Sequence, residues 1–431
     1  MSSKILEIIR EVAIKMREDF VKSRESELIR LRSEAYRAFY KVSPLVPREQ
    51  EAPIVFVDAG FNNVETDVSV LYIINIGGCV RDEEGRVRYV HEICDMPPYE
   101  TYFVYGRWVQ GEKGSEFVIR FIPVDENPVL IRPESAPRIS EEITAMLNKQ
   151  TSGSGLKLMS NFKKFVNYVE GLMEIAYGIK LKRFLLKKPI CVIDGTLIRW
   201  FSVKRSLKSF KFDGLNVLEK ITGIDRDVLI NELNDVMGLT KTTKFTSFAR
   251  AREIFYGNVG RVDLGLYSYV DEESVEKASS VIEDIRIKYG VDMAMDTINL
   301  FNKLIFPRND IWVTRFPITT SENTVFHLEK YIQRPLINIE RGMVVFNSKL
   351  ASELGKTIPR VSQEIFLYRT PVIGQLPHGF MEVDEMVRLK NETFRDISES
   401  FVQVIREITG TIGHPLEYMF MSTQRMRIGY R

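Results

Sequence analysis

The sequence has few of the side chains that support thiol, imidazole or zinc chemistry. Its 431 residues include only three cysteines and four histidines, which are Cys79, Cys94, Cys191, His91, His327, His378 and His414. None of the cysteines forms a CxxC pair, and the scattered histidines match no zinc pattern. Cys191 lies in an apolar run and is expected to be a small buried hydrophobe. Any metal site should therefore use carboxylates, a donor set that favours Mg²⁺ or Mn²⁺.

Long apolar runs are also absent. No stretch of about 18 uninterrupted apolar residues occurs, so we expect no membrane span. The first twenty residues are amphipathic and carry acids, without the apolar block and cleavage site of a signal peptide, and we expect a cytoplasmic protein. There is no GxxxxGK[ST] phosphate loop, so the chain is not expected to hydrolyse ATP by itself.

The net charge is only +2, but it is unevenly placed. Residues 156–211 hold thirteen Lys or Arg against three acids, a local charge of +10 that leaves −8 for the rest of the chain. Aromatic residues are interleaved with these cations. Such a segment suits a polyanion such as nucleic acid, and a solvated basic face is the alternative. The cations that we single out as candidate DNA contacts are Lys204, Arg205, Lys208, Lys241 and Lys244.

Two short apolar strands each end on an aspartate. Residues 54–57 run into Asp58-Ala-Gly, and residues 190–193 run into Asp194-Gly-Thr. Continuous apolar runs of this length are typical of strands buried on both faces. Each motif by itself is more typical of a turn, because Asp bonds its own backbone and Gly takes positive φ. If the strands are neighbours, two carboxylates meet and repel each other unless a divalent cation binds.

The pattern of elements predicts a mixed α/β fold. Helices are expected at 4–40, 139–147 and 156–183, near 273–288 and 292–305, over 324–332, and from about 382 to 408. Strands are expected at 54–58, 67–77, 86–94, 235–239 and 311–316, with further short strands at 336–340 and 343–346. We predict an N-terminal helical arm (1–45) before one domain (46–431) with a helical and β insertion at about 199–335. The order fits an RNase H-like mixed sheet flanked by helices.

Further candidates accompany the two aspartates. Glu170 and Glu174 lie four residues apart, hence on one face of the 156–183 helix, and Asp384 lies near the start of a C-terminal helix. Three or four carboxylates can hold two divalent ions that activate water and steady the leaving oxygen in phosphodiester cleavage. Lys241, in a loop after a strand, would neutralise charge that grows on the phosphate oxygens.

Each of these candidates also has a structural alternative. The two glutamates would suit a plain solvated helix face, and Lys241 a solvated loop. Asp384 would stabilise the N-terminus of its helix. A metal-dependent phosphatase or nucleotidyl enzyme on another α/β fold is a further alternative for the whole chain.

Four segments carry a resemblance to a known family: VDAG at 57–60, IDGTLI at 193–198, DVMGLTKTTKFTSFAR at 235–250 and LPHGFMEVDEMVRLKNETF at 376–394. In their order and context they resemble the NurA nucleases of archaea and some bacteria, over most of the chain. The resemblance implies an RNase H-like fold and a Mn²⁺-dependent deoxyribonuclease, with Mg²⁺ as the other candidate ion. It also implies 5′–3′ exonuclease and single-strand endonuclease activity in the resection of DNA double-strand breaks, a homodimer, and a HerA-type hexameric ATPase as partner.

By position, the resemblance makes Asp58 and Asp194 core metal ligands and Glu174 the helix acid, with Glu170 as second choice. Lys241 matches the lysine of a Gly-x-x-Lys loop, and Asp384 falls where the family places a C-terminal ligand. The sequence departs from the family in having Asp-Ala-Gly at 58–60, and GHPLEYM at 413–419 offers His414 in place of Asp384. These departures leave open a catalytically inactive DNA-binding or scaffold paralogue that regulates a translocase.

Overall fold

The computed structural model describes most of the chain. It covers residues 3–410, apart from 26, 47–48, 66–68, 95, 112–113, 149–154, 186–188, 200–212, 242–263, 307–308, 322–323 and 372–374. Among the described residues, no helix is both long and apolar enough to cross a membrane.

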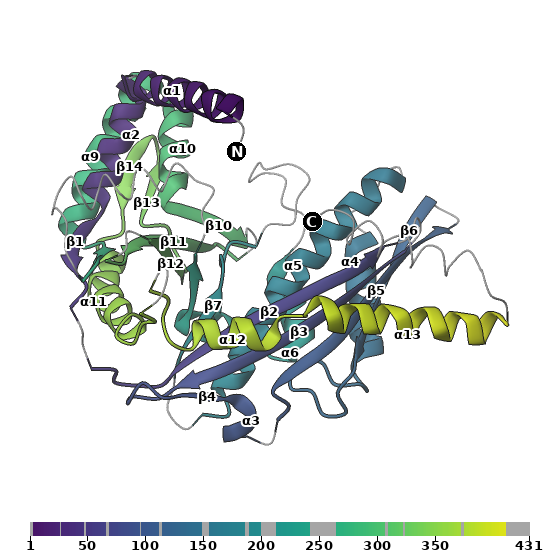
Figure 1. The fold of residues 1–431 in the computed structure, drawn as a ribbon. Coiled ribbons are helices and arrows are strands. Elements are labelled where there is room, and N and C mark those ends of the chain that lie inside the picture. Colours follow the sequence, from purple (N-terminus) through teal and green to yellow (C-terminus); the bar gives the residue numbers. More distant parts are fainter. Residues whose placement is uncertain are drawn as a thin grey trace.

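A twelve-stranded mixed sheet forms the centre of the molecule (Figure 1). The strands are β1 (Lys41–Pro44), β2 (Ile54–Glu65), β3 (Ser69–Arg81), β4 (Val87–Tyr89), β5 (Tyr99–Gly111), β6 (Gly114–Pro123), β7 (Ile190–Asp194), β8 (Val236–Thr240), β9 (Leu266–Tyr269), β10 (Asn302–Phe306), β11 (Ile311–Thr319) and β12 (Val325–Ile332), and a separate hairpin joins β13 (Ile337–Glu340) to β14 (Met343–Phe346). The main path runs β1-β9-β11-β12-β8-β7-β2-β3-β5-β6, with β10 beside β11 and β4 beside β3.

Helices cover both faces of this sheet. They are α1 (Ser3–Glu25), α2 (Glu27–Phe39), α3 (Val90–Ile93), α4 (Ala136–Asn148), α5 (Gly155–Lys182), α6 (Gly214–Thr222), α7 (Arg226–Glu232), a 3₁₀ turn (Leu233–Asp235), α9 (Glu272–Tyr289), α10 (Val291–Phe301), α11 (Ser348–Ile365), α12 (Phe380–Val387) and α13 (Asn391–Thr409). The prediction of a mixed sheet flanked by helices is confirmed.

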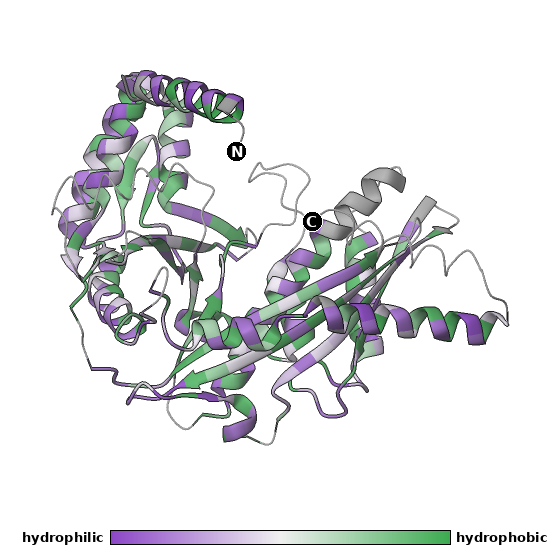
Figure 2. Cartoon of the chain, in the orientation of Figure 1, coloured by the Kyte–Doolittle hydropathy of each residue, from purple (hydrophilic) through white to green (hydrophobic). Residues whose placement is uncertain are grey.

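Two apolar cores lie on opposite faces of the sheet. One holds the buried side of α5 together with α4 and α6, and the other holds α2, α9, α11 and α12. Alternate residues of the central strands point into each core: Val55 and Val57 face α5, whereas Phe56 faces α12. Figure 2 shows these central strands as largely hydrophobic ribbon. The two-sided burial explains why the apolar runs at 54–57 and 190–193 are continuous rather than alternating.

The free edge of strand β6 is covered by helix α4. Ser140, Thr144 and Asn148, spaced four apart, accept hydrogen bonds from the backbone N–H groups of residues 121, 119 and 117. Their shared helix face thus replaces a neighbouring strand, which protects the edge from pairing with another chain.

The sequence misassigned one central strand. Residues 324–332 were expected to be helical, but residues 325–332 form β12, which pairs with β11 and β8. Apolar residues at 325, 326, 328, 331 and 332 imitate a helical period because both faces of the strand are buried. The C-terminal helix predicted to run to about 408 is likewise two helices, α12 and α13, broken at residues 388–390.

Candidate metal centre

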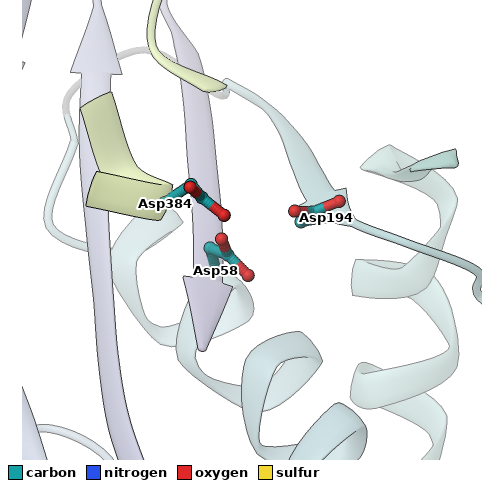
Figure 3. A group of neighbouring side chains, drawn as sticks. All are labelled: Asp58, Asp194 and Asp384. Carbon is teal, nitrogen blue, oxygen red and sulfur yellow. The ribbon is translucent and has the colours of Figure 1, made fainter. Parts of the chain in front are cut away.

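Asp58 and Asp194 are brought together by parallel strand pairing. Strands β2 and β7 run side by side with Val57 opposite Ile193, so the next residue of each strand is an aspartate. Asp384 approaches from helix α12, and Figure 3 shows its side chain beside that of Asp58. One carboxylate oxygen from each of the three residues lies within 4.8 Å of the other two.

Helix α12 reaches this position because two glycines leave room beneath it. A Cβ at Gly60 would lie 2.4 Å from the carbonyl oxygen of Val387, and one at Gly77 would lie 2.4 Å from the methyl carbon of Met386. The amide of Asn75 donates to the Val387 carbonyl at 3.3 Å and satisfies the end of the helix. The glycine of the 57–60 motif therefore sets how closely Asp384 approaches Asp58.

The turn after Asp194 is fixed against strand β8. Gly195 has a φ of +90°, and its N–H donates to the carbonyl of Leu239 at 3.1 Å. A Cβ at Gly238 would lie 2.8 Å from the Leu197 side chain and 2.9 Å from the Gly195 carbonyl oxygen. Glycines at 195 and 238 thus let the chain turn tightly across β8, which is why an Asp-Gly turn and a candidate ligand coincide here.

Burial and the neighbouring carboxylates raise the proton affinity of Asp58 and of Asp194. Asp58 is 6% exposed, and burial, followed by the nearby Asp194 charge, raises its pKa to about 8 against the pull of Lys241. Burial also raises the pKa of Asp194, again opposed by Lys241. Like charges held together in a partly buried site favour a bound cation, because the cation removes both the repulsion and the cost of burial.

Lys241 supplies a positive charge between two of the three carboxylates. Its Nζ lies 2.8 Å from Asp194 Oδ2 and 3.7 Å from Asp384 Oδ1, and it sits 4.4 Å from the centre of the Phe380 ring. Arg388, the residue that follows α12, pairs with the Asp384 carboxylate. The trio is therefore partly neutralised by side chains of the same chain.

Glu170 and Glu174 lie on the other side of the sheet from α12. Arg199 donates to Glu174 Oε2 at 2.7 Å, and its guanidinium lies against α5 where Gly171 has no side chain. Burial raises the pKa of Glu170 to about 7 and that of Glu174 well above its usual value. Both glutamates feel the charge of Asp194, but neither belongs to the group of three carboxylates.

Sequence reasoning missed Arg199 and Arg388 as parts of this site. In the sequence, Arg199 is one of many cations of the basic segment. Its place directly after the 193–198 motif is the signal that could have identified it. Arg388 lies four residues after Asp384, a spacing that predicts an ion pair on a helix. The candidate DNA contacts Lys204, Arg205, Lys208 and Lys244, and the alternative ligand His414, lie outside the described residues.

The donor set fits a hard divalent cation. Within the part of the chain that the structure describes, the grouped ligand atoms are all carboxylate oxygens, the group that Mg²⁺ and Mn²⁺ prefer. Asp58 Oδ1 already accepts a hydrogen bond from the Ala59 N–H at 2.8 Å, which fixes the orientation of that carboxylate. A site of this kind can bind and polarise a phosphate ester or a water molecule.

Comparison with known proteins gives structural neighbours only. No family model matches the sequence, and no curated protein matches it. Among solved structures, the chain is similar to the NurA nuclease from Sulfolobus solfataricus, with 9% identity, a TM-score of 0.45, and coverage of 96% of this chain and 99% of that one. It is also similar to NurA bound to dAMP and manganese, with 10% identity, a TM-score of 0.41, and coverage of 92% and 96%. Because these TM-scores are below 0.5, the centre has to be judged by its own residues.

Proposed function

We propose that this protein is a divalent-metal-dependent nuclease that hydrolyses phosphodiester bonds in DNA, with Mn²⁺ as its preferred ion. The observation that carries the proposal is the grouping of Asp58, Asp194 and Asp384, which come from two strands and a helix. Such a cluster costs folding free energy unless something positive binds it, and clusters of this kind are common at functional sites. The strand order β5-β3-β2-β7-β8, with β7 and β8 parallel to β2, supports the RNase H-like arrangement.

Each residue has a proposed role. The carboxylates of Asp58, Asp194 and Asp384 would hold the ion. When bound, a divalent cation supplies an activated water and a counter-charge to the phosphate. Lys241 would swing from Asp194 to the scissile phosphate and neutralise the developing negative charge.

The α5 glutamates have a proposed role at the rear of the centre. The pair Glu170 and Glu174, held by Arg199, would take a second ion or orient the attacking water, with Glu174 as the first candidate. A mechanism with two ions would use these glutamate oxygens beside those of the three aspartates.

The finer features of the proposal rest on the sequence resemblance. They are the 5′–3′ exonuclease and single-strand endonuclease activities, a role in the resection of DNA double-strand breaks, a homodimer, a HerA-type hexameric ATPase as partner, and a cytoplasmic location. The basic segment at 156–211 supports DNA as the polyanion. Sedimentation and binding assays with a HerA-type ATPase would test the two assembly proposals directly.

The decisive experiment measures nuclease activity with Mn²⁺ on single-stranded and linear double-stranded DNA. Asp58→Asn and Asp194→Asn keep the size of each side chain and should lower the cleavage rate by about a hundredfold or more. Asp82→Asn removes a carboxylate that pairs with Arg86 in a distant turn, and it serves as the matched control. Full activity in both site variants would refute the proposal.

A catalytically inactive DNA-binding protein is the second candidate. The observation that favours it is the set of internal cations already paired with the acids: Lys241, Arg388 and Arg199. Such a protein would bind DNA with a steep salt dependence but would cleave none with any divalent ion. Turnover by the wild type therefore separates the two, and Glu174→Gln then tests whether the nuclease uses this carboxylate at its centre.

A further inference from the structure

Glu329 is a buried carboxylate that joins strand β12 to the turn after Asp194. It is 1% exposed. Its Oε2 accepts hydrogen bonds from the Thr196 hydroxyl and the Leu197 N–H, each at 2.7 Å. Its Oε1 accepts from Arg315 Nε, also at 2.7 Å. A buried carboxylate with three donors and one counter-charge is held firmly, so the groups that it binds are held as well.

The same turn leads from one part of the candidate centre to the other. Two residues before Thr196 is Asp194, and two residues after Leu197 is Arg199, which pairs with Glu174. The carbonyl of Leu197 also accepts a hydrogen bond from the Tyr331 hydroxyl at 3.2 Å. Glu329 and Tyr331, which lie on one face of β12, thus hold Leu197 at its N–H and at its carbonyl.

We propose that Glu329 is a positioning residue for the metal centre, acting through the 194–199 turn on both Asp194 and the Arg199–Glu174 pair. The inference rests on the proposed function, because it assigns a metal-related role to a residue outside the ligand set. Residues that orient metal ligands through hydrogen bonds affect metal affinity without touching the ion. Loss of the carboxylate would free the turn, so Asp194 would sample orientations that do not face Asp58 and Asp384.

A buried carboxylate can also matter only for stability, and Glu100 provides a matched control for that case. Glu100 is 0% exposed and lies on strand β5. It accepts hydrogen bonds from the Tyr102 hydroxyl and from the N–H groups of residues 129 and 130. Like Glu329 it satisfies a hydroxyl and backbone donors, but those donors hold a loop that contributes no candidate ligand.

The test compares Glu329→Ala and Glu329→Gln with Glu100→Ala and Glu100→Gln in the full chain. Mn²⁺ affinity is measured by calorimetry, and amide hydrogen exchange of residues 190–199 is measured without metal. Glu329→Ala should raise the Kd for Mn²⁺ about 10- to 100-fold and speed exchange at Gly195, Leu197 and Ile198. Glu329→Gln, whose amide oxygen can still accept from Leu197, should recover most of the affinity. The Glu100 variants should lower Tm and leave both readouts unchanged.

Several outcomes would overturn the proposal. It fails if Glu329→Ala binds Mn²⁺ as tightly as the wild type, or if the Glu100 variants weaken Mn²⁺ binding equally. If Glu329→Ala does not fold, Glu329→Gln is the deciding variant. It should then show a modest loss of Mn²⁺ affinity and faster amide hydrogen exchange in residues 190–199, and unchanged values would refute the role. If the wild type binds no Mn²⁺, the proposed function fails, and hydrogen exchange alone decides whether Glu329 positions the turn.

Discussion

Gly60 lies directly beneath the carbonyl group of Val387, the last residue of helix α12. A Cβ at position 60 would lie 2.4 Å from that oxygen and 3.0 Å from the carbonyl carbon, too close for any side chain. The neighbouring strand offers a contrast at Gly77, where the closest atom is the mobile end of the Met386 side chain. Backbone cannot move aside as a methionine methyl can, so Gly60 limits the distance between helix and strand more strictly than Gly77 does.

Gly60→Ala should therefore displace α12 and carry Asp384 away from Asp58. We expect Mn²⁺ affinity to fall about tenfold or more, as for loss of a ligand-orienting contact, while Gly77→Ala should have a smaller effect because Met386 can adopt another rotamer. Titration of both variants with Mn²⁺, with circular dichroism as a check on folding, measures the difference. Equal effects of the two substitutions would show that the approach of α12 does not set the site.

The raised pKa of Asp58 makes the stability of the metal-free protein depend on pH. Burial and the Asp194 charge raise this pKa to about 8 in the folded state, whereas an unfolded aspartate titrates near 4. Between these values the folded state holds a proton that the unfolded state releases. The stabilising contribution is thus complete below about pH 4 and is lost as the pH rises to about 8.

Asp58→Asn should remove the contribution of Asp58 to that dependence and leave those of Asp194, Glu170 and Glu174. In the presence of EDTA at pH 8, the variant should unfold at a Tm higher than the wild type by on the order of 2 °C, because a buried negative charge is gone. Wild-type protein should gain Tm on addition of Mn²⁺, and the variant should not. Thermal melts between pH 5 and pH 8 test both statements, and a wild-type Tm that rises over this range in EDTA would contradict the account.

Lys241 and a metal ion should compete for the same carboxylates. The lysine Nζ lies 2.8 Å from Asp194 Oδ2, where a cation would also bind. Lys241→Met should tighten Mn²⁺ binding by about two- to fivefold, which corresponds to the free energy of a partly exposed ion pair. The same substitution should lower the cleavage rate by about a hundredfold. Lys241→Arg keeps the charge and should leave the affinity for Mn²⁺ close to that of the wild type.

Parallel measurements of Mn²⁺ affinity and turnover separate these two effects. If Lys241→Met weakens metal binding, the lysine supports the centre and does not compete with the ion. If turnover is unchanged at saturating Mn²⁺, Lys241 has no part in neutralising the phosphate.

Much of this architecture was open to prediction because its signals are local. Patterns in consecutive residues indicate which face of a strand or helix is buried. Here they are the apolar runs at 54–57 and 190–193 and the apolar stripe of the 156–183 helix. The aspartate that ends each run is visible for the same reason. Strand β12 is an exception, because burial of both its faces gives its apolar residues a helix-like spacing. Glu329 lies in this segment, which the sequence predicts to be helical, so its role could not be predicted from the sequence.

The sequence by itself determined the β-character of the two aspartate strands and the long helix before the second of them, and it predicted that carboxylates would dominate any metal site. Only the tertiary structure decided that Asp384 approaches Asp58 across more than 300 residues of chain, that Lys241 pairs with Asp194, and that Arg199 holds Glu174. The physical reason is the distance along the chain over which each signal acts. Periodicity indicates how a residue is buried relative to its neighbours in the chain. The partner of a charged side chain depends instead on which distant elements pack closely, and glycines at 60, 171 and 238 permit that packing here.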